Sequence, residues 1–146
     1  MSVTITIENN RQFCLANGLA DERSYDCDCC DGDGCDCCDD GRITYLVFPW
    51  DLNIANGNFA PLWRALGFAL DANDDWAGHT DGRVLAAALE RVTAAQLARP
   101  ESISTGAKGA MFYDVGLSVE RIERYLTALR QIANEAERRE SPVVWH

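Results

Sequence analysis

The sequence has few of the residues that catalysis needs. It contains only two histidines, one of them His146 at the C-terminus. Hydrolytic chemistry of the Ser-His-Asp or Cys-His kind needs a histidine beside a nucleophile, and no such arrangement is visible in this chain. We therefore expect a protein that is not an enzyme.

Basic residues are also scarce. The chain has 13 Lys and Arg against 23 Asp and Glu, so its net charge is −10. Because a phosphate backbone and an anionic membrane surface both attract a basic face, we expect no direct nucleic-acid binding and no membrane binding. A protein partner with a basic surface is the expected binding class.

Long apolar runs are missing as well. No stretch approaches the length of a membrane span, and the first ten residues, MSVTITIENN, lack the basic and apolar regions of a secretory signal. These features predict a cytoplasmic protein. In a reducing compartment, clustered cysteines hold metal more often than they form disulfides.

Cysteine is what the sequence has in excess, and six of its seven cysteines lie within residues 27–38. The motif CDCCD occurs twice, eight positions apart, and each copy contains a C-x-x-C pair. Four thiolates at this spacing suit the tetrahedral coordination of zinc, and the glycines between the two pairs let the chain reverse. We predict one zinc ion held by Cys27, Cys30, Cys35 and Cys38.

Two further thiols, Cys29 and Cys37, exceed the ligands of one tetrahedral site. The C-x-C-C grouping is similar to metallothioneins, which allows a cluster of several metals. Disulfides and unligated thiols are two other states open to the same cysteines. Seven aspartates between residues 26 and 40 add negative charge, and a divalent ion would offset their repulsion of the thiolates.

The same segment concentrates the charge of the chain. Nine of the acids lie within residues 21–40 against a single arginine. Since Gly and Asp at this density do not build regular structure, we expect residues 21–41 to form an acidic, cysteine-rich loop. Anionic side chains gathered in one place select a basic partner and accelerate encounter with it. The expected partner-binding residues are Asp28, Asp31, Asp33 and Asp36.

Periodicity predicts one α+β domain over residues 1–146, with the loop 21–41 inserted before the second strand. A small, mostly antiparallel sheet is expected from strands at about residues 3–8, 42–48, 111–115 and 143–145. Three or four helices should pack on it, and their patterns lie at residues 9–20, 61–70, 81–98 and 118–139. We expect Ser118 to cap the helix at residues 118–139 and Asn58 to cap the helix at residues 61–70. The strand 143–145 is expected to pair with 42–48 or 111–115 and to bury Trp145.

Two other motifs have ordinary explanations. The segment from Asp71 begins like a calcium loop, but Trp76 and Gly82 stand where that loop needs glycine and glutamate, which favours a solvated turn. Cys14 lies between Phe13 and Leu15, and this apolar setting favours a core position over a nucleophile.

Part of the chain resembles known sequences. The run LNIANGNFAPLWRALGF at residues 52–68, the later helix and the terminal VVWH resemble small bacterial and phage proteins with an Asn-rich turn before a Leu-Gly helix and a C-terminal Val-x-Trp. This resemblance implies a phage or mobile-element source. The first cysteine unit is similar to the CxxCxGxG zinc repeat of J-domain co-chaperones, whereas the second has Asp40 and Arg42 at the glycine positions. That resemblance implies a zinc knuckle.

Together these features predict a small acidic zinc-binding interaction protein, such as an inhibitor of a host nucleic-acid-processing or defence enzyme. The alternative is a metal-handling or thiol redox protein that uses the cysteine cluster directly.

Overall fold

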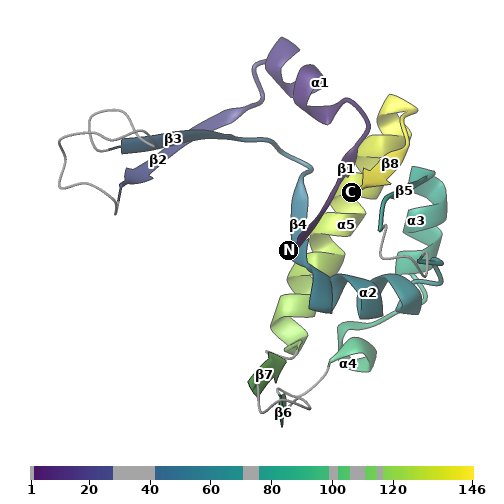
Figure 1. Cartoon of the computed structure of the whole chain (residues 1–146). Coiled ribbons are helices and arrows are strands. Elements are labelled where there is room, and N and C mark those ends of the chain that lie inside the picture. Colours follow the sequence, from purple (N-terminus) through teal and green to yellow (C-terminus); the bar gives the residue numbers. More distant parts are fainter. Residues whose placement is uncertain (1, 28–41, 71–75, 99–101, 106–110, 115–116) are drawn as a thin grey trace. The chain divides into compact units, whose positions relative to one another are not determined.

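The computed structural model describes residues 2–27, 42–70, 76–98, 102–105, 111–114 and 117–146 (Figure 1). They form an α+β structure with two compact units. The larger unit consists of Met1–Glu8 and Trp50–His146, and the smaller unit is Asn9–Pro49. The predicted insertion, residues 21–41, belongs to the smaller unit.

Four short strands of the larger unit form an antiparallel sheet in the order β4-β1-β8-β5. β1 (Ser2–Ile7) pairs with β4 (Leu52–Ala55) on one side and with β8 (Val143–Trp145) on the other. β5 (Gly78–Thr80) pairs with the free side of β8. Alternate residues of β1 are buried, as a strand with one face toward a core requires. The small antiparallel sheet is therefore confirmed.

The partners of the C-terminal strand differ from the prediction. Ile5 of β1 and Gly78 of β5 both lie opposite Trp145, whereas the strand at 42–48 or the one at 111–115 was expected to pair with it. The predicted burial of Trp145 is confirmed, with 7% of its surface exposed. β5 lies in the segment that follows Asp71, for which the sequence predicted a solvated turn. Gly-His-Thr is too short to show the alternation of a strand.

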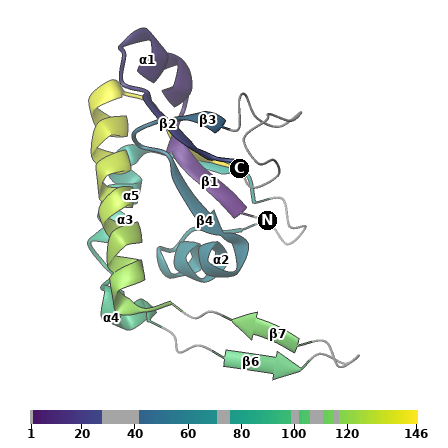
Figure 2. The same cartoon turned by 90° about the vertical axis from the view of Figure 1, so that its left-hand side faces the viewer.

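The helix α5 (Val119–Arg139) is the longest element and agrees closely with the prediction. The Ser118 hydroxyl accepts a hydrogen bond from the Arg121 N–H at 3.3 Å, which caps the helix as expected. Its apolar stripe is buried. The helix lies beside β1 and β4 of the sheet (Figure 2). The buried residues of this stripe are Ile122, Leu126, Leu129, Ile132, Ala133 and Ala136.

Two other predicted helices have different bounds. The segment 81–98 holds two helices, α3 (Gly82–Leu89) and α4 (Ala94–Leu97), because Thr93 and Gln96 form a capping box that starts a new helix. In α3, Leu85 and Leu89 are buried, whereas the neighbouring Val84 is exposed. α2 (Asn56–Ala65) begins before the predicted start at Pro61, so Asn58 is a buried residue inside the helix and not its cap.

Close packing of α3 on α5 depends on a glycine. A Cβ added at Gly82 would lie 2.6 Å from the carbonyl oxygen of Ala133, closer than real contacts allow. The two helices can therefore approach this closely only with glycine at position 82.

Aromatic rings fill another part of the core. The centroid of the Trp63 ring lies 4.9 Å from that of Phe68 and 4.9 Å from that of Trp145. The C-terminal strand is thus fixed by both its backbone pairing and its tryptophan.

Two hairpins account for the remaining strands. β6 (Ser102–Thr105) pairs with β7 (Met111–Asp114), so the predicted strand at 111–115 exists but lies outside the four-stranded sheet. In the smaller unit, α1 (Asn10–Ala16) is followed by β2 (Asp21–Asp26) and β3 (Arg42–Val47), which pair with each other. The predicted strand at 42–48 is likewise confirmed as a strand and wrong as a member of the main sheet.

The first part of the predicted acidic loop is regular structure. Asp21–Asp26 forms β2 because one edge of its backbone pairs with β3, although DERSYD has no apolar alternation. The remainder of that loop, residues 28–41, lies outside the described residues. Among the described residues, no helix is long and apolar enough to cross a membrane.

Candidate functional site

The β2–β3 hairpin, which we call the ribbon, leads directly into the cysteine segment. Its register runs from Asp21 opposite Val47 to Asp26 opposite Arg42. The side chains of this last pair lie 3.9 Å apart, from Nε to Oδ1. Both are exposed, so the ion pair itself adds little stability. The backbone pairing nevertheless places the residues before and after the segment 27–41 side by side.

The ribbon has two chemically different faces, because side chains alternate along each strand and directly opposite residues share a face. One face carries Tyr25, Ile43, Tyr45 and Val47, with Asp21 and Arg23 at its start. We call it the aromatic face. The two tyrosine rings meet edge to face with centroids 5.9 Å apart. They are 52% and 45% exposed, which is high for a contacting aromatic pair.

The opposite face is polar. It carries acidic and hydroxyl side chains next to one arginine and one leucine, and its residues are Glu22, Ser24, Asp26, Arg42, Thr44 and Leu46. Leu46 is an exposed apolar residue on this face. Both faces of β2 are solvent-exposed along its whole length.

Contacts at the base of the ribbon join its end to α1 within the smaller unit. The Asn10 side-chain amide donates to the Pro49 carbonyl at 2.7 Å, and the Arg11 guanidinium lies 5.3 Å from the centre of the Phe48 ring. Cys14 is buried, as predicted, and its thiol donates to the Asn10 side-chain oxygen at 3.4 Å. Asn10 thus connects Cys14 to the segment that follows β3.

One of the predicted zinc ligands, Cys27, is described, and it is a buried residue immediately after β2. The other predicted site residues lie outside the described residues, and they are Asp28, Cys29, Cys30, Asp31, Asp33, Cys35, Asp36, Cys37 and Cys38. The described part of the chain holds no group of three or more His, Cys, Asp or Glu side chains that could bind a metal ion. The zinc site and the aspartate surface therefore stay predictions.

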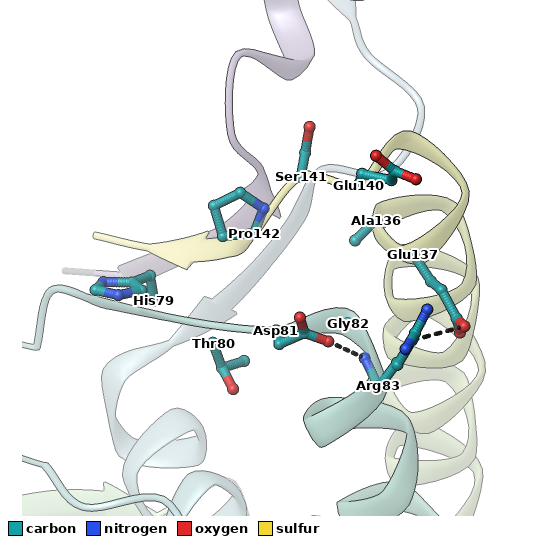
Figure 3. Close-up of a pocket in the computed structure, with 10 residues that line it drawn as sticks. All are labelled: His79, Thr80, Asp81, Gly82, Arg83, Ala136, Glu137, Glu140, Ser141 and Pro142. Carbon is teal, nitrogen blue, oxygen red and sulfur yellow. Dashed lines mark hydrogen bonds and ion pairs between the residues drawn. The ribbon is translucent and has the colours of Figure 1, made fainter.

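A separate pocket of about 480 Å³ lies in the larger unit, where the start of α3 meets the end of α5 (Figure 3). The Asp81 carboxylate accepts from the Arg83 N–H at 2.7 Å and caps α3. The Arg83 guanidinium lies 3.0 Å from the Glu137 carboxylate, and both are exposed. Since these charges serve to cap and join the two helices, they are not poised for chemistry on a ligand.

The pocket could not be found from the sequence. Its lining comes from residues 79–83, 136–137 and 140–142, which the packing of α3 on α5 brings together. Sequence patterns show His79 only as an isolated histidine in a polar stretch. Neither segment carries a motif that points to the other.

A charged cluster closes the last turns of α5. Hydrogen bonds from Arg138, and then from Arg139, lower the pKa of the Glu135 carboxyl to about 2. Arg139 Nε lies 2.7 Å from Glu135, and its guanidinium lies 4.4 Å from the centre of the Trp50 ring. This cluster is structural, because it joins the helix end to the chain entering β4.

No protein-family model matches the chain, and neither do a curated protein or a solved structure. The resemblance to bacterial and phage proteins stays a prediction. Of the described features, the ribbon lies next to the cysteine segment in the chain, and its last pair, Asp26 and Arg42, flanks that segment.

Proposed function

We propose that this protein is a small acidic interaction protein that holds one zinc ion in its cysteine segment. The ribbon presents that segment to a protein partner with a basic surface. The pairing of Asp26 with Arg42 supports the proposal, because it brings the two ends of the segment 27–41 together. Two C-x-x-C pairs can meet around one ion only when their connecting chain doubles back, and a hairpin supplies that reversal.

Zinc binding would also stabilise the ribbon. A two-stranded hairpin is marginally stable in water unless a third strand, a helix or a cross-link supports it. Metal binding contributes its free energy to folding when the site does not exist in the unfolded chain. Four thiolates from Cys27, Cys30, Cys35 and Cys38 would cross-link the end of the ribbon in this way.

The charge of the segment sets the class of partner. Nine acids within residues 21–40 make this part of the chain strongly anionic, and such a surface attracts basic proteins and repels nucleic acid. Enzymes that process nucleic acids carry large basic surfaces. We therefore propose inhibition of a host nucleic-acid-processing or defence enzyme, without catalysis by this chain.

Elemental analysis of the protein purified under reducing conditions tests the zinc site. We expect about one zinc per chain. Replacing Cys30 and Cys35 with serine should remove it, whereas the matched double variant Cys29→Ser/Cys37→Ser should retain it. Several labile metals per chain would favour the metal-handling alternative, and disulfides among these cysteines in the cell would contradict the site.

The partner surface has its own test. Changing Asp28, Asp31, Asp33 and Asp36 to lysine should weaken binding to a purified basic partner and flatten its salt dependence. The zinc content should stay at about one per chain. Binding that is indifferent to both salt and these four changes would contradict the proposed surface.

A further inference from the structure

The ribbon leaves an apolar surface in solvent. Tyr25 and Tyr45 on the aromatic face are about half exposed, and Ile43 and Val47 beside them are only half-buried. In the described residues, β2 pairs with β3 and with no other strand. A two-stranded ribbon is marginally stable by itself, and a sheet needs three or more strands with a hydrophobic face to be stable independently. A third strand paired with the open edge of β2 would therefore stabilise the ribbon and extend its aromatic face.

The edge of β2 sets the chemistry of that third strand. Along this edge the aromatic face presents Tyr25 after Asp21 and Arg23, and the polar face presents Glu22 and Asp26 on either side of Ser24. A strand added here alternates between the two faces. Its residues on one side meet an aromatic ring, and those on the other meet two carboxylates.

We propose that the edge of β2 binds an extended segment of a partner protein in which basic residues alternate with apolar ones. The segment adds a strand to the ribbon through main-chain hydrogen bonds. Its apolar side chains cover Tyr25, and its Lys or Arg side chains pair with Glu22 and Asp26. This inference rests on the proposed function and specifies the part of the basic partner that is recognised.

Charge argues against a second copy of the chain as the occupant. Each copy has a net charge of −10, so two copies repel each other. Two β2 edges pairing about Ser24 in antiparallel fashion would also place Glu22 of each copy opposite Asp26 of the other. Like charges directly opposite destabilise a strand pair, whereas a basic segment converts both contacts into attractions.

A synthetic peptide tests the proposal on the full-length protein purified under reducing conditions. The probe is a seven-residue capped peptide that alternates lysine with valine, and its control has the same composition with the lysines grouped together. Amide NMR shifts upon titration should concentrate in β2 for the alternating peptide. The grouped peptide should bind at least several-fold more weakly, because its side chains cannot match both faces at once.

Charge variants locate the contact. The double variant Glu22→Lys/Asp26→Lys should weaken binding of the alternating peptide about tenfold. The matched control Glu90→Lys/Glu123→Lys makes the same change in net charge at two exposed positions, the C-cap of α3 and the second turn of α5, and should change affinity less than twofold. Equal losses in the two variants, equal binding of the two peptides, or shifts that leave β2 unchanged would overturn the proposal.

Two further readouts separate the possible failures. Sedimentation that shows concentration-dependent dimers displaced by the peptide would assign the edge to a second copy and overturn the proposed occupant. Zinc content is measured on the same sample. Peptide binding without zinc would defeat the proposed zinc function and leave this inference standing, whereas zinc without β2 shifts would do the reverse.

Discussion

The guanidinium of Arg139 lies over the ring of Trp50, 4.4 Å from its centre. Trp50 has a backbone φ of +62°, in the left-handed region that bulky residues rarely adopt. The Arg139 side chain is 6% exposed and also contacts Glu135, which is 11% exposed. A strained residue is therefore held in place by a buried cation at the end of the longest helix.

Removing that cation should be costly. We expect Arg139→Ala to lower the free energy of unfolding by about 3 kcal/mol, because it removes the ring contact and one partner of a buried ion pair. Arg138→Ala is the matched control, since Arg138 contacts the same carboxylate but is 64% exposed, and its loss should be clearly smaller than that of Arg139→Ala. Urea unfolding of both variants measures the difference, and equal losses would argue against the Trp50 contact.

The same cluster predicts an acid-dependent loss of stability. The folded-state pKa of Glu135, about 2, lies below its ordinary value of 4.5. A depressed carboxyl pKa contributes stability above pH 4.5, and that contribution is lost as the pH falls toward 2. After screening by solvent around Arg138, we expect a contribution of about 1–2 kcal/mol.

Glu135→Gln tests this assignment by unfolding measurements between pH 5 and pH 2. The variant should be less stable at pH 5 and should lose less stability than the wild-type protein across the interval. Parallel curves for the two proteins would assign the acid sensitivity to other carboxylates.

The packing of α3 on α5 predicts opposite outcomes for two glycines. Gly82→Ala should destabilise the protein by about 1–3 kcal/mol, because the new methyl group would meet the Ala133 carbonyl and the backbone cannot move freely. Gly57→Ala adds a methyl group at an exposed position of α2 with no atom within 4 Å, and it should leave stability unchanged or raise it by about 0.5–1 kcal/mol. Thermal melts of the two variants provide the comparison.

The C-terminal strand should be essential to the core. We expect Trp145→Ala to cost about 3–5 kcal/mol, since it removes a buried aromatic ring that contacts Trp63. Val144→Ala, on the neighbouring half-buried position of the same strand, should cost about 1 kcal/mol or less. A Trp145→Ala melting temperature within a degree of wild type would show that the ring is not part of the core.

Periodic elements were predictable from the sequence, and their partners were not. α5 is long and strongly periodic, and Ser118 marks its start, so local information suffices. The pairing of β8 with β1 depends on packing between segments at opposite ends of the chain. β5 and β2 were missed because three residues show no alternation and a charged strand shows no apolar pattern.

The candidate site was also predictable only in part. The C-x-x-C spacing is a local signal, so the sequence alone predicts a zinc site and its ligands. The ribbon beside it depends on the register that places Tyr25 near Tyr45 and Asp26 opposite Arg42. Register follows from long-range pairing, and nothing in DERSYD or RITYLV specifies it by itself.

The position of β1 between β4 and β8 has a consequence for synthesis on the ribosome. β4 emerges early enough to pair with β1 while most of the chain is still unmade, but β8 emerges only after α5. Until then one edge of β1 is open, and it carries Ile5 and Ile7. In incomplete chains, β1 is therefore an apolar strand with an unpaired edge, which chaperones and proteases can bind. Once β8 has been synthesised and pairs with β1, this edge is no longer accessible to them.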